Sequence, residues 1–181
     1  PQLLADGVHI ASTSPCRTNG NALYASGTDI DGQAWANPPA MGCDQWHPQP
    51  VITMPPRWQP GAGAGQAVVW TVVVVGQEPF DCWWTKDGAP IEDGARYGGA
   101  HTTDLLVRGF GLADAGAYQV VVSNAFGMAT SPVARVVVHC VDAAGAAPTA
   151  PYTSWTTAAT NIQSAIDAAA PGALVLVTNG F

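Results

Sequence analysis

The sequence predicts a mainly β protein, with an antiparallel β-sandwich at its centre and one short α-helix near its C-terminal end. Short runs rich in apolar, β-branched and aromatic residues recur between residues 66 and 140. Turn signals that contain glycine and aspartate separate these runs, as in sandwiches built from short strands. One later segment has apolar residues at helical spacing. The expected strands cover residues 67–75, 80–85, 103–107, 117–123 and 133–139.

The composition excludes several classes of protein. Hydrophobic residues make up 48% of the 181 residues, and charged residues make up 10%, so disorder driven by high charge is excluded. The net charge is −7 and Lys86 is the only lysine, so we expect no nucleic acid partner. No apolar run approaches the roughly 20 residues that span a membrane, so membrane insertion is not expected. Because the chain opens without a methionine and ends shortly after an apolar run, we expect it to be part of a longer protein.

Residues 1–50 are rich in glycine and proline, which predicts turns and short strands. A disulfide between Cys16 and Cys43 would close a loop of about 27 residues and contribute about 3 kcal/mol. Two buried thiols are an equally good interpretation. Asp29 and Asp31 have the D-x-D-G spacing of a calcium loop. A third ligand and a distal glutamate are missing, so a β-turn is favoured over a metal site.

The most specific motif lies in the centre of the chain. Trp84 belongs to the run Trp-Trp-Thr-Lys-Asp-Gly, and 30 positions later Asp114 opens the run Asp-Ala-Gly-Ala-Tyr-Gln-Val. From about residue 50 to 140 the chain therefore resembles an immunoglobulin-like domain of the I-set or bacterial kind. The resemblance implies that Trp84 lies in the core, that Tyr118 forms a tyrosine corner, and that Asp114 ties down the preceding turn. It also implies that Val72 and Val120 occupy the two positions where the family often has a disulfide.

Residues 161–169 form the expected helix. Thr160 is the expected N-cap, and Gln163 completes a capping box. Pro171 and Gly172 end the helix, and residues 174–177 form a short apolar strand. The apolar residues that fall at helical spacing on one face of the helix are Ile162, Ala165, Ile166 and Ala169.

The two ends of the chain carry a second resemblance. Residues 152–180 resemble the opening of right-handed parallel β-helix proteins of the pectin-lyase-like type, in which a helix caps the solenoid. Residues 14–44 resemble the closing segment of such a β-helix. The resemblance divides the chain into a β-helix remnant (1–50), the sandwich (51–141), and a linker, capping helix and first strand of a following β-helix (142–181). It makes neighbouring β-helix modules of the same chain the expected partners.

The outer face of the sandwich is expected to be apolar. Trp83 should point away from the core because it precedes the inward-facing Trp84. Val69, Val73 and Val75 are expected on the outside as well. A face of this kind contacts a neighbouring module or, through the tryptophan, a glycan. The sequence favours the neighbouring module and leaves the glycan open.

We find no catalytic motif, metal-ligand set or phosphate loop in the sequence. We therefore expect no catalytic residue and no cofactor. The two resemblances together imply a non-catalytic structural or adhesion module, a spacer, in a large secreted or cell-surface bacterial protein. A glycan or a cell-surface protein is a further candidate partner. The alternative is an accessory module of a β-helix enzyme that binds or degrades polysaccharides at an active site outside this chain.

Overall fold

The computed structural model describes residues 3, 10–11, 13–30, 32, 34–36, 38–41, 48–58 and 64–178. Internal contacts divide the chain into two compact units. The first unit contains Pro1–Met54, Val73–Asp81 and Val122–Thr130, and the second contains Pro55–Val72, Cys82–Val121 and Ser131–Phe181.

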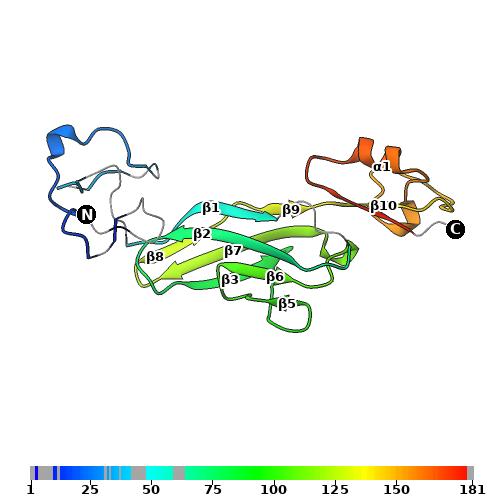
Figure 1. Ribbon diagram of the computed structural model, residues 1–181, viewed down its shortest axis with the longest axis horizontal. Helices are drawn as coiled ribbons and strands as arrows, with labels where there is room; N and C mark the ends of the chain where they lie inside the picture. Colours follow the sequence, from blue (N-terminus) through cyan, green and yellow to red (C-terminus); the bar gives the residue numbers. More distant parts are fainter. Residues whose placement is uncertain are drawn as a thin grey trace. The chain divides into compact units, whose positions relative to one another are not determined.

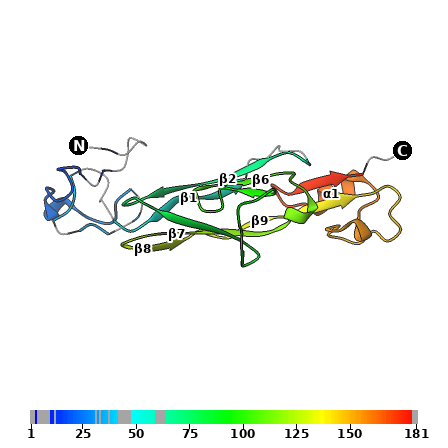
Figure 2. The same ribbon diagram turned by 90° about the horizontal axis from the view of Figure 1, so that it is seen from below.

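Two sheets form the sandwich that the sequence predicted (Figures 1 and 2). The first sheet has the order β1-β2-β6-β5, with β1 (Val51–Trp58), β2 (Val68–Val75), β5 (Tyr97–Gly98) and β6 (Asp104–Val107). The second has the order β4-β3-β7-β8, with β3 (Asp81–Lys86), β4 (Ala89–Pro90), β7 (Gly116–Asn124) and β8 (Gly127–Thr130). A further strand, β9 (Ala134–Val136), also pairs with β7. The pairs β2–β6, β5–β6, β3–β4 and β7–β9 are antiparallel.

The core of the sandwich forms because alternate residues of a strand point to the same face. In β7, Tyr118, Val120 and Val122 are buried, which is the face predicted from the sequence. In β2, burial alternates from Val68 onward, and Trp70 is 1% exposed. The rings of Trp70 and Tyr118 stack with their centroids 5.2 Å apart and their planes at 18°. This contact joins the two sheets within the second unit, and such a pair adds about 0.5–1.5 kcal/mol beyond the buried area.

The alternation in β2 is interrupted near its end. Val69 and Val73 are 43% and 37% exposed, as expected for the outer face. Val74 is half-buried, and Val75 is buried. The assignment of Val75 to the outer face is therefore wrong, because a shift of one residue in a strand moves the next side chain to the opposite face.

The last expected strand, residues 133–139, is divided between two sheets. β9 ends at Val136, and the next strand, β10 (Val138–Val141), pairs with β11 (Leu174–Val177) in parallel. All four residues of β10 are buried, so the alternation expected for a sandwich strand stops. The prediction that His139 continues a strand of the sandwich is therefore wrong. Parallel strands are usually covered on both faces, and this explains why consecutive residues of β10 are buried.

The C-terminal segment contains the 3₁₀ helix η3 (Trp155–Thr157) and the helix α1 (Ile162–Ala168). The N-cap of α1 is Asn161, whose side chain accepts from the backbone N–H of Ser164 at 2.8 Å. Thr160 is therefore not the cap, because the helix begins one residue later than expected. The side chain of Gln163 donates to Asp167.

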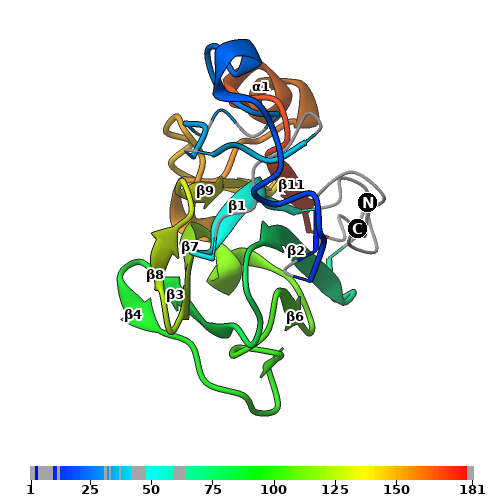
Figure 3. The same ribbon diagram turned by 90° about the vertical axis from the view of Figure 1, so that its left-hand side faces the viewer.

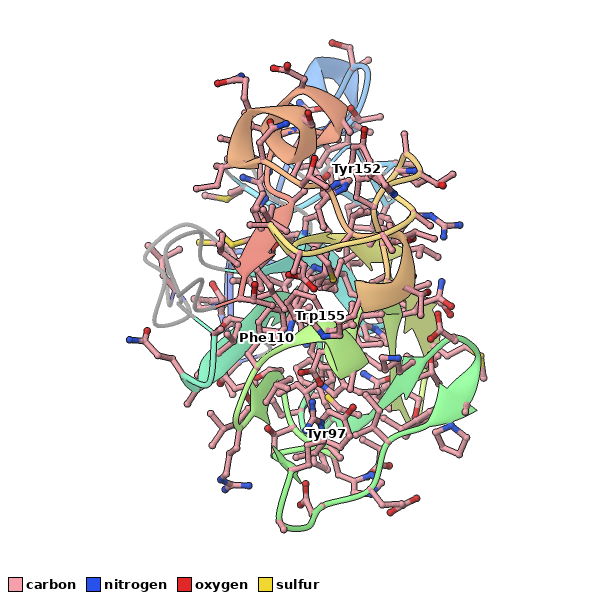
Figure 4. All side chains as sticks on the ribbon, turned by 90° about the vertical axis from the view of Figure 1, so that its right-hand side faces the viewer. Tyr97, Phe110, Tyr152 and Trp155 are labelled. Atoms are coloured by element: carbon pink, nitrogen blue, oxygen red, sulfur yellow. The ribbon has the colours of Figure 1, made fainter. Side chains whose placement is uncertain are left out.

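A small apolar cluster supports the parallel pair of strands. Ala165 of α1 packs with Val141 and Ala159 in a buried cluster, against which Tyr152 and Val175 lie. Figure 4 labels Tyr152 in this C-terminal segment. The expected apolar face of α1 is only partly covered, because Ile162 and Ile166 remain 51% and 50% exposed.

The N-terminal segment has little regular structure among its described residues, as its glycine and proline content predicted. It contains the 3₁₀ helix η1 (Ala22–Tyr24), drawn in blue in Figure 3, and an isolated bridge between Thr28 and Ala34. A third 3₁₀ helix, η2 (Leu112–Asp114), precedes β7. No helix in the described part of the chain is long and apolar enough to cross a membrane.

Candidate functional site

A polar cluster surrounds the buried carboxylate of Asp114, at the end of η2. Asp114 is fully buried, whereas the Arg96 side chain is 41% exposed. The guanidinium of Arg96 donates to Asp114 through Nε at 3.0 Å and through Nη2 at 2.5 Å. The backbone N–H of Gly111 donates to Asp114 Oδ2 at 2.8 Å. Three donors thus hold one buried carboxylate, which makes its burial tolerable.

The hydroxyl of Tyr118 completes this cluster. It donates to the backbone carbonyl of Asp114 at 3.0 Å, four residues upstream, in the geometry of a tyrosine corner. Burial raises the pKa of Tyr118 far above its ordinary value. The hydrogen bonds to Asp114 raise the pKa of Arg96. Both groups therefore keep their protons throughout the ordinary pH range, and the arrangement stabilises the turn before β7.

Trp84, in β3, lies in the core of the sandwich. The side chain is completely buried, and its Nε1–H donates to the carbonyl of Thr102 at 2.9 Å. Val72 and Val120 are 3% and 0% exposed. The two positions that would carry the family's disulfide are thus occupied by buried valines.

A second polar link ties the turn after β3 to the start of β7. The N–H of Asp87 donates to the carbonyl of Ala117 at 2.8 Å, and the N–H of Ala117 donates to Asp87 Oδ1 at 2.8 Å. The hydrogen bond from Ala117, followed by the one from Lys86, lowers the pKa of Asp87. Gly116 has φ +151°, and a Cβ there would lie 2.5 Å from Asp87 Oδ2. A side chain at this φ would be strained and its Cβ would displace the Asp87 carboxylate, which explains the glycine of the Asp-Ala-Gly-Ala-Tyr run.

Sequence reasoning missed three residues that these contacts use. Arg96 lies in a polar loop and Asp87 lies in a common turn motif, so neither differs from an ordinary surface residue in the sequence. Trp70 belongs to a valine-rich run. Trp70 itself was the one sequence signal for the stack between the Trp70 and Tyr118 rings, because it lies in β2, in the sheet opposite β7.

The candidate sites in the N-terminal segment are only partly described. Cys43 lies outside the described residues, so the disulfide between Cys16 and Cys43 stays a prediction. Asp29 is buried at 7% exposure, and Asp31 lies outside the described residues. Within the described ranges, no three His, Cys, Asp or Glu side chains gather closely enough to hold a metal ion.

Trp83 and Cys140 occupy different surroundings. Trp83 is half-buried, so part of its ring faces solvent.

Cys140 is completely buried in β10, and burial raises the pKa of its thiol. A raised pKa lowers the fraction of reactive thiolate, which is typical of a structural cysteine.

Described residues of the first unit line at least two hollows. One, of about 310 Å³, is lined by residues that include Trp35, Pro39 and Met41. The other, of about 400 Å³, is lined by residues of the β2–β3 loop and the β7–β8 turn, including Glu78 and Phe126. Among the described residues that line these hollows, none is a serine, cysteine or histidine.

Comparison with known proteins agrees with this fold. Residues 49–124 match the family model of the immunoglobulin domain. The match includes Trp84, Asp114 and Tyr118 and ends before β8. The human SPEG neighbor protein is 36% identical over 86 residues, which are 43% of this chain and 36% of that protein. The chain thus matches about a third of the length of this relative. Because the relative is human, the comparison does not support the bacterial origin expected from the sequence.

Solved structures of immunoglobulin domains also resemble part of the chain. The tandem Ig repeats of Dlar match with a TM-score of 0.41 and 23% identity, over 49% of this chain and 45% of that one. The titin M4 structure matches with a TM-score of 0.42 and 22% identity, over 47% of this chain and 90% of that one. The two sheets and the family match over residues 49–124 show a mainly β, immunoglobulin-like sandwich, and the comparisons give no support to flanking β-helix segments.

Proposed function

We propose that this chain is a non-catalytic structural module, an immunoglobulin-like spacer that holds neighbouring parts of a larger protein apart. The proposal rests on the hydrogen bonds that the Asp114 carboxylate accepts. All three donors around its carboxylate come from the sandwich itself, so the most deeply buried charged group of the described chain stabilises the fold. The immunoglobulin-domain match over residues 49–124 supports the same conclusion.

The C-terminal segment supports a more specific proposal about the neighbours. β10 and β11 form a two-stranded parallel sheet, and β11 consists of four apolar residues. Its last residue, Val177, is 50% exposed. Parallel sheets of so few strands are rarely stable unless both faces are covered. We propose that a further parallel strand pairs with β11, as the neighbouring β-helix module expected from the sequence would provide.

A spacer of this kind belongs outside the cell or on its surface, as many immunoglobulin-like domains do, and we propose that location. Its outer face contacts a neighbouring module rather than a glycan, because Trp83 is already half-covered. The polysaccharide-enzyme alternative receives no support from the comparisons, in which the family match is to the immunoglobulin domain.

A glycan-array screen of the protein tests this proposal. Wild type should bind no glycan with saturation. Saturable binding that Trp83→Ala abolishes would place recognition on the sandwich and overturn the spacer function. Trp155→Ala is the matched control, since Trp155 is 41% exposed in the C-terminal segment and belongs to no strand of the sandwich.

A further inference from the structure

Three segments of the first unit meet at one amide side chain. Asn124, the last residue of β7, donates through Nδ2 to the carbonyl of Pro48 at 2.5 Å and to the carbonyl of Gln77 at 2.7 Å. Its Oδ1 accepts from the N–H of Phe126 at 2.9 Å. Both donor hydrogens and the acceptor of the amide are therefore used. One side chain thus connects the segment before β1, the β2–β3 loop and the β7–β8 turn.

A backbone hydrogen bond also joins the segment before β1 to the β2–β3 loop. The N–H of Gln77 donates to the carbonyl of Pro48 at 3.1 Å, so this carbonyl accepts two hydrogen bonds. We call Asn124, Gln77 and Pro48 the entry clamp. All three residues belong to the first compact unit.

Two glycines, Gly76 and Gly127, allow residues 48–50 to pass close to the β2–β3 loop and the β7–β8 turn. Gly76 has φ +137°, and a Cβ at this position would lie 2.6 Å from the carbonyl oxygen of Gln49. A Cβ on Gly127 would lie 3.3 Å from Gln49 Cγ. Pro50, which follows, is buried. Gly76 therefore leaves room for the backbone of Gln49, and Gly127 leaves room for its side chain.

We propose that the β2–β3 loop and the β7–β8 turn form a docking surface for residues 48–50, and that Asn124 is the positioning residue of this surface. The chain that enters the sandwich is then held at a fixed joint and does not act as a free linker. The inference rests on the proposed spacer function and extends it, since a spacer sets the position of its neighbours only if the chain leaves it at a fixed point. The occupant of the surface is the preceding segment of the same chain.

The chemistry of the clamp requires an amide at position 124. An aspartate would keep the acceptor for the Phe126 N–H, so it would preserve the turn. It would lose both donors and would place a negative charge against the carbonyl oxygens of Pro48 and Gln77. Asn124→Asp therefore removes the two hydrogen bonds that Asn124 donates and keeps the one that it accepts from Phe126, whereas an alanine would remove all three.

Hydrogen exchange, followed residue by residue by NMR, tests the proposal. The reporter is the N–H of Gln77, whose partner is the Pro48 carbonyl. In Asn124→Asp, exchange at Gln77 should accelerate on the order of tenfold, because two hydrogen bonds of the junction are lost. The N–H of Ser131, bonded to Val120 at 2.9 Å, should keep its wild-type protection and so report an intact sandwich.

Asn161→Asp is the matched control. It makes the same change of charge and shape, but only the Oδ1 of Asn161 is used, to cap α1. Exchange at Gln77 should not change in this variant. If Asn124→Asp does not fold, Gly76→Ala replaces it, because the added Cβ pushes on Gln49 without altering Asn124.

Two results would overturn the proposal. Exchange at Gln77 within twofold of wild type would mean that Asn124 does not hold the entering chain. Equal acceleration at Gln77 and Ser131 would mean that the side chain stabilises the whole sandwich and has no local role. Neither result depends on glycan binding, so a failure of the clamp and a failure of the spacer function are observed separately.

Discussion

Replacing Arg96 by methionine removes two of the three donors that reach the Asp114 carboxylate. The aliphatic part of the side chain is kept, so the change isolates the guanidinium. The carboxylate is fully buried and would keep only the N–H of Gly111. Breaking a fully buried ion pair costs roughly 3–5 kcal/mol. Because Arg96 is 41% exposed and water can partly replace its head group, we expect a loss of about 2–3 kcal/mol in the free energy of unfolding.

Urea denaturation followed by tryptophan fluorescence measures this loss. Lys86→Met is the matched control, since it breaks the exposed pair between Lys86 and Asp87, at 3.0 Å, and should change stability far less. Adding Asp114→Asn to Arg96→Met should cost less than the sum of the two single substitutions, because they share one interaction. A loss below about 0.5 kcal/mol for Arg96→Met would refute the argument, because that is the range of an ordinary surface pair.

Three further predictions concern the sandwich. Trp84→Ala should cost about 3–5 kcal/mol in urea denaturation, because it empties a fully buried position; an unchanged midpoint would contradict its place in the core. Gly116→Ala should lower the thermal unfolding temperature, since its Cβ would lie 2.5 Å from Asp87 Oδ2, while Gly94→Ala, whose Cβ meets nothing within 4 Å, should change it little. Asp87 has a pKa below its ordinary 3.8 in the fold, so its stabilisation is present above pH 3.8 and is lost as the pH falls through the folded value. The difference in stability between wild type and Asp87→Asn should therefore be larger at pH 7 than at pH 2.5, and a constant difference would contradict this linkage.

The features that the sequence predicts best are local ones. The alternation in β7 and its Asp-Ala-Gly-Ala-Tyr run identify an inward-facing strand, because both the period of two and the turn chemistry depend on neighbouring residues. The helix α1 was expected within one residue of each of its ends. Its cap was misplaced because Thr160 and Asn161 are adjacent and both are good N-caps.

The features that the sequence missed depend on contacts between distant segments. Residues 133–139 read as one strand, but the first part pairs with β7 and the last part pairs with β11, 36 positions further along the chain. Hydrophobicity alone does not distinguish these two environments. The bond between Arg96 and Asp114 and the clamp at Asn124 join loops 18 and 76 positions apart, and no local pattern indicates either of them.

Single-molecule stretching of the protein, held near residue 48 and near residue 142, tests the spacer function most directly. A spacer must keep its length under tension until the whole sandwich unfolds. The strands from β1 to β9 cover residues 51–136, so unfolding should lengthen the chain in one step by up to about 300 Å. Gradual lengthening at low force, with no single step of this size, would contradict the account.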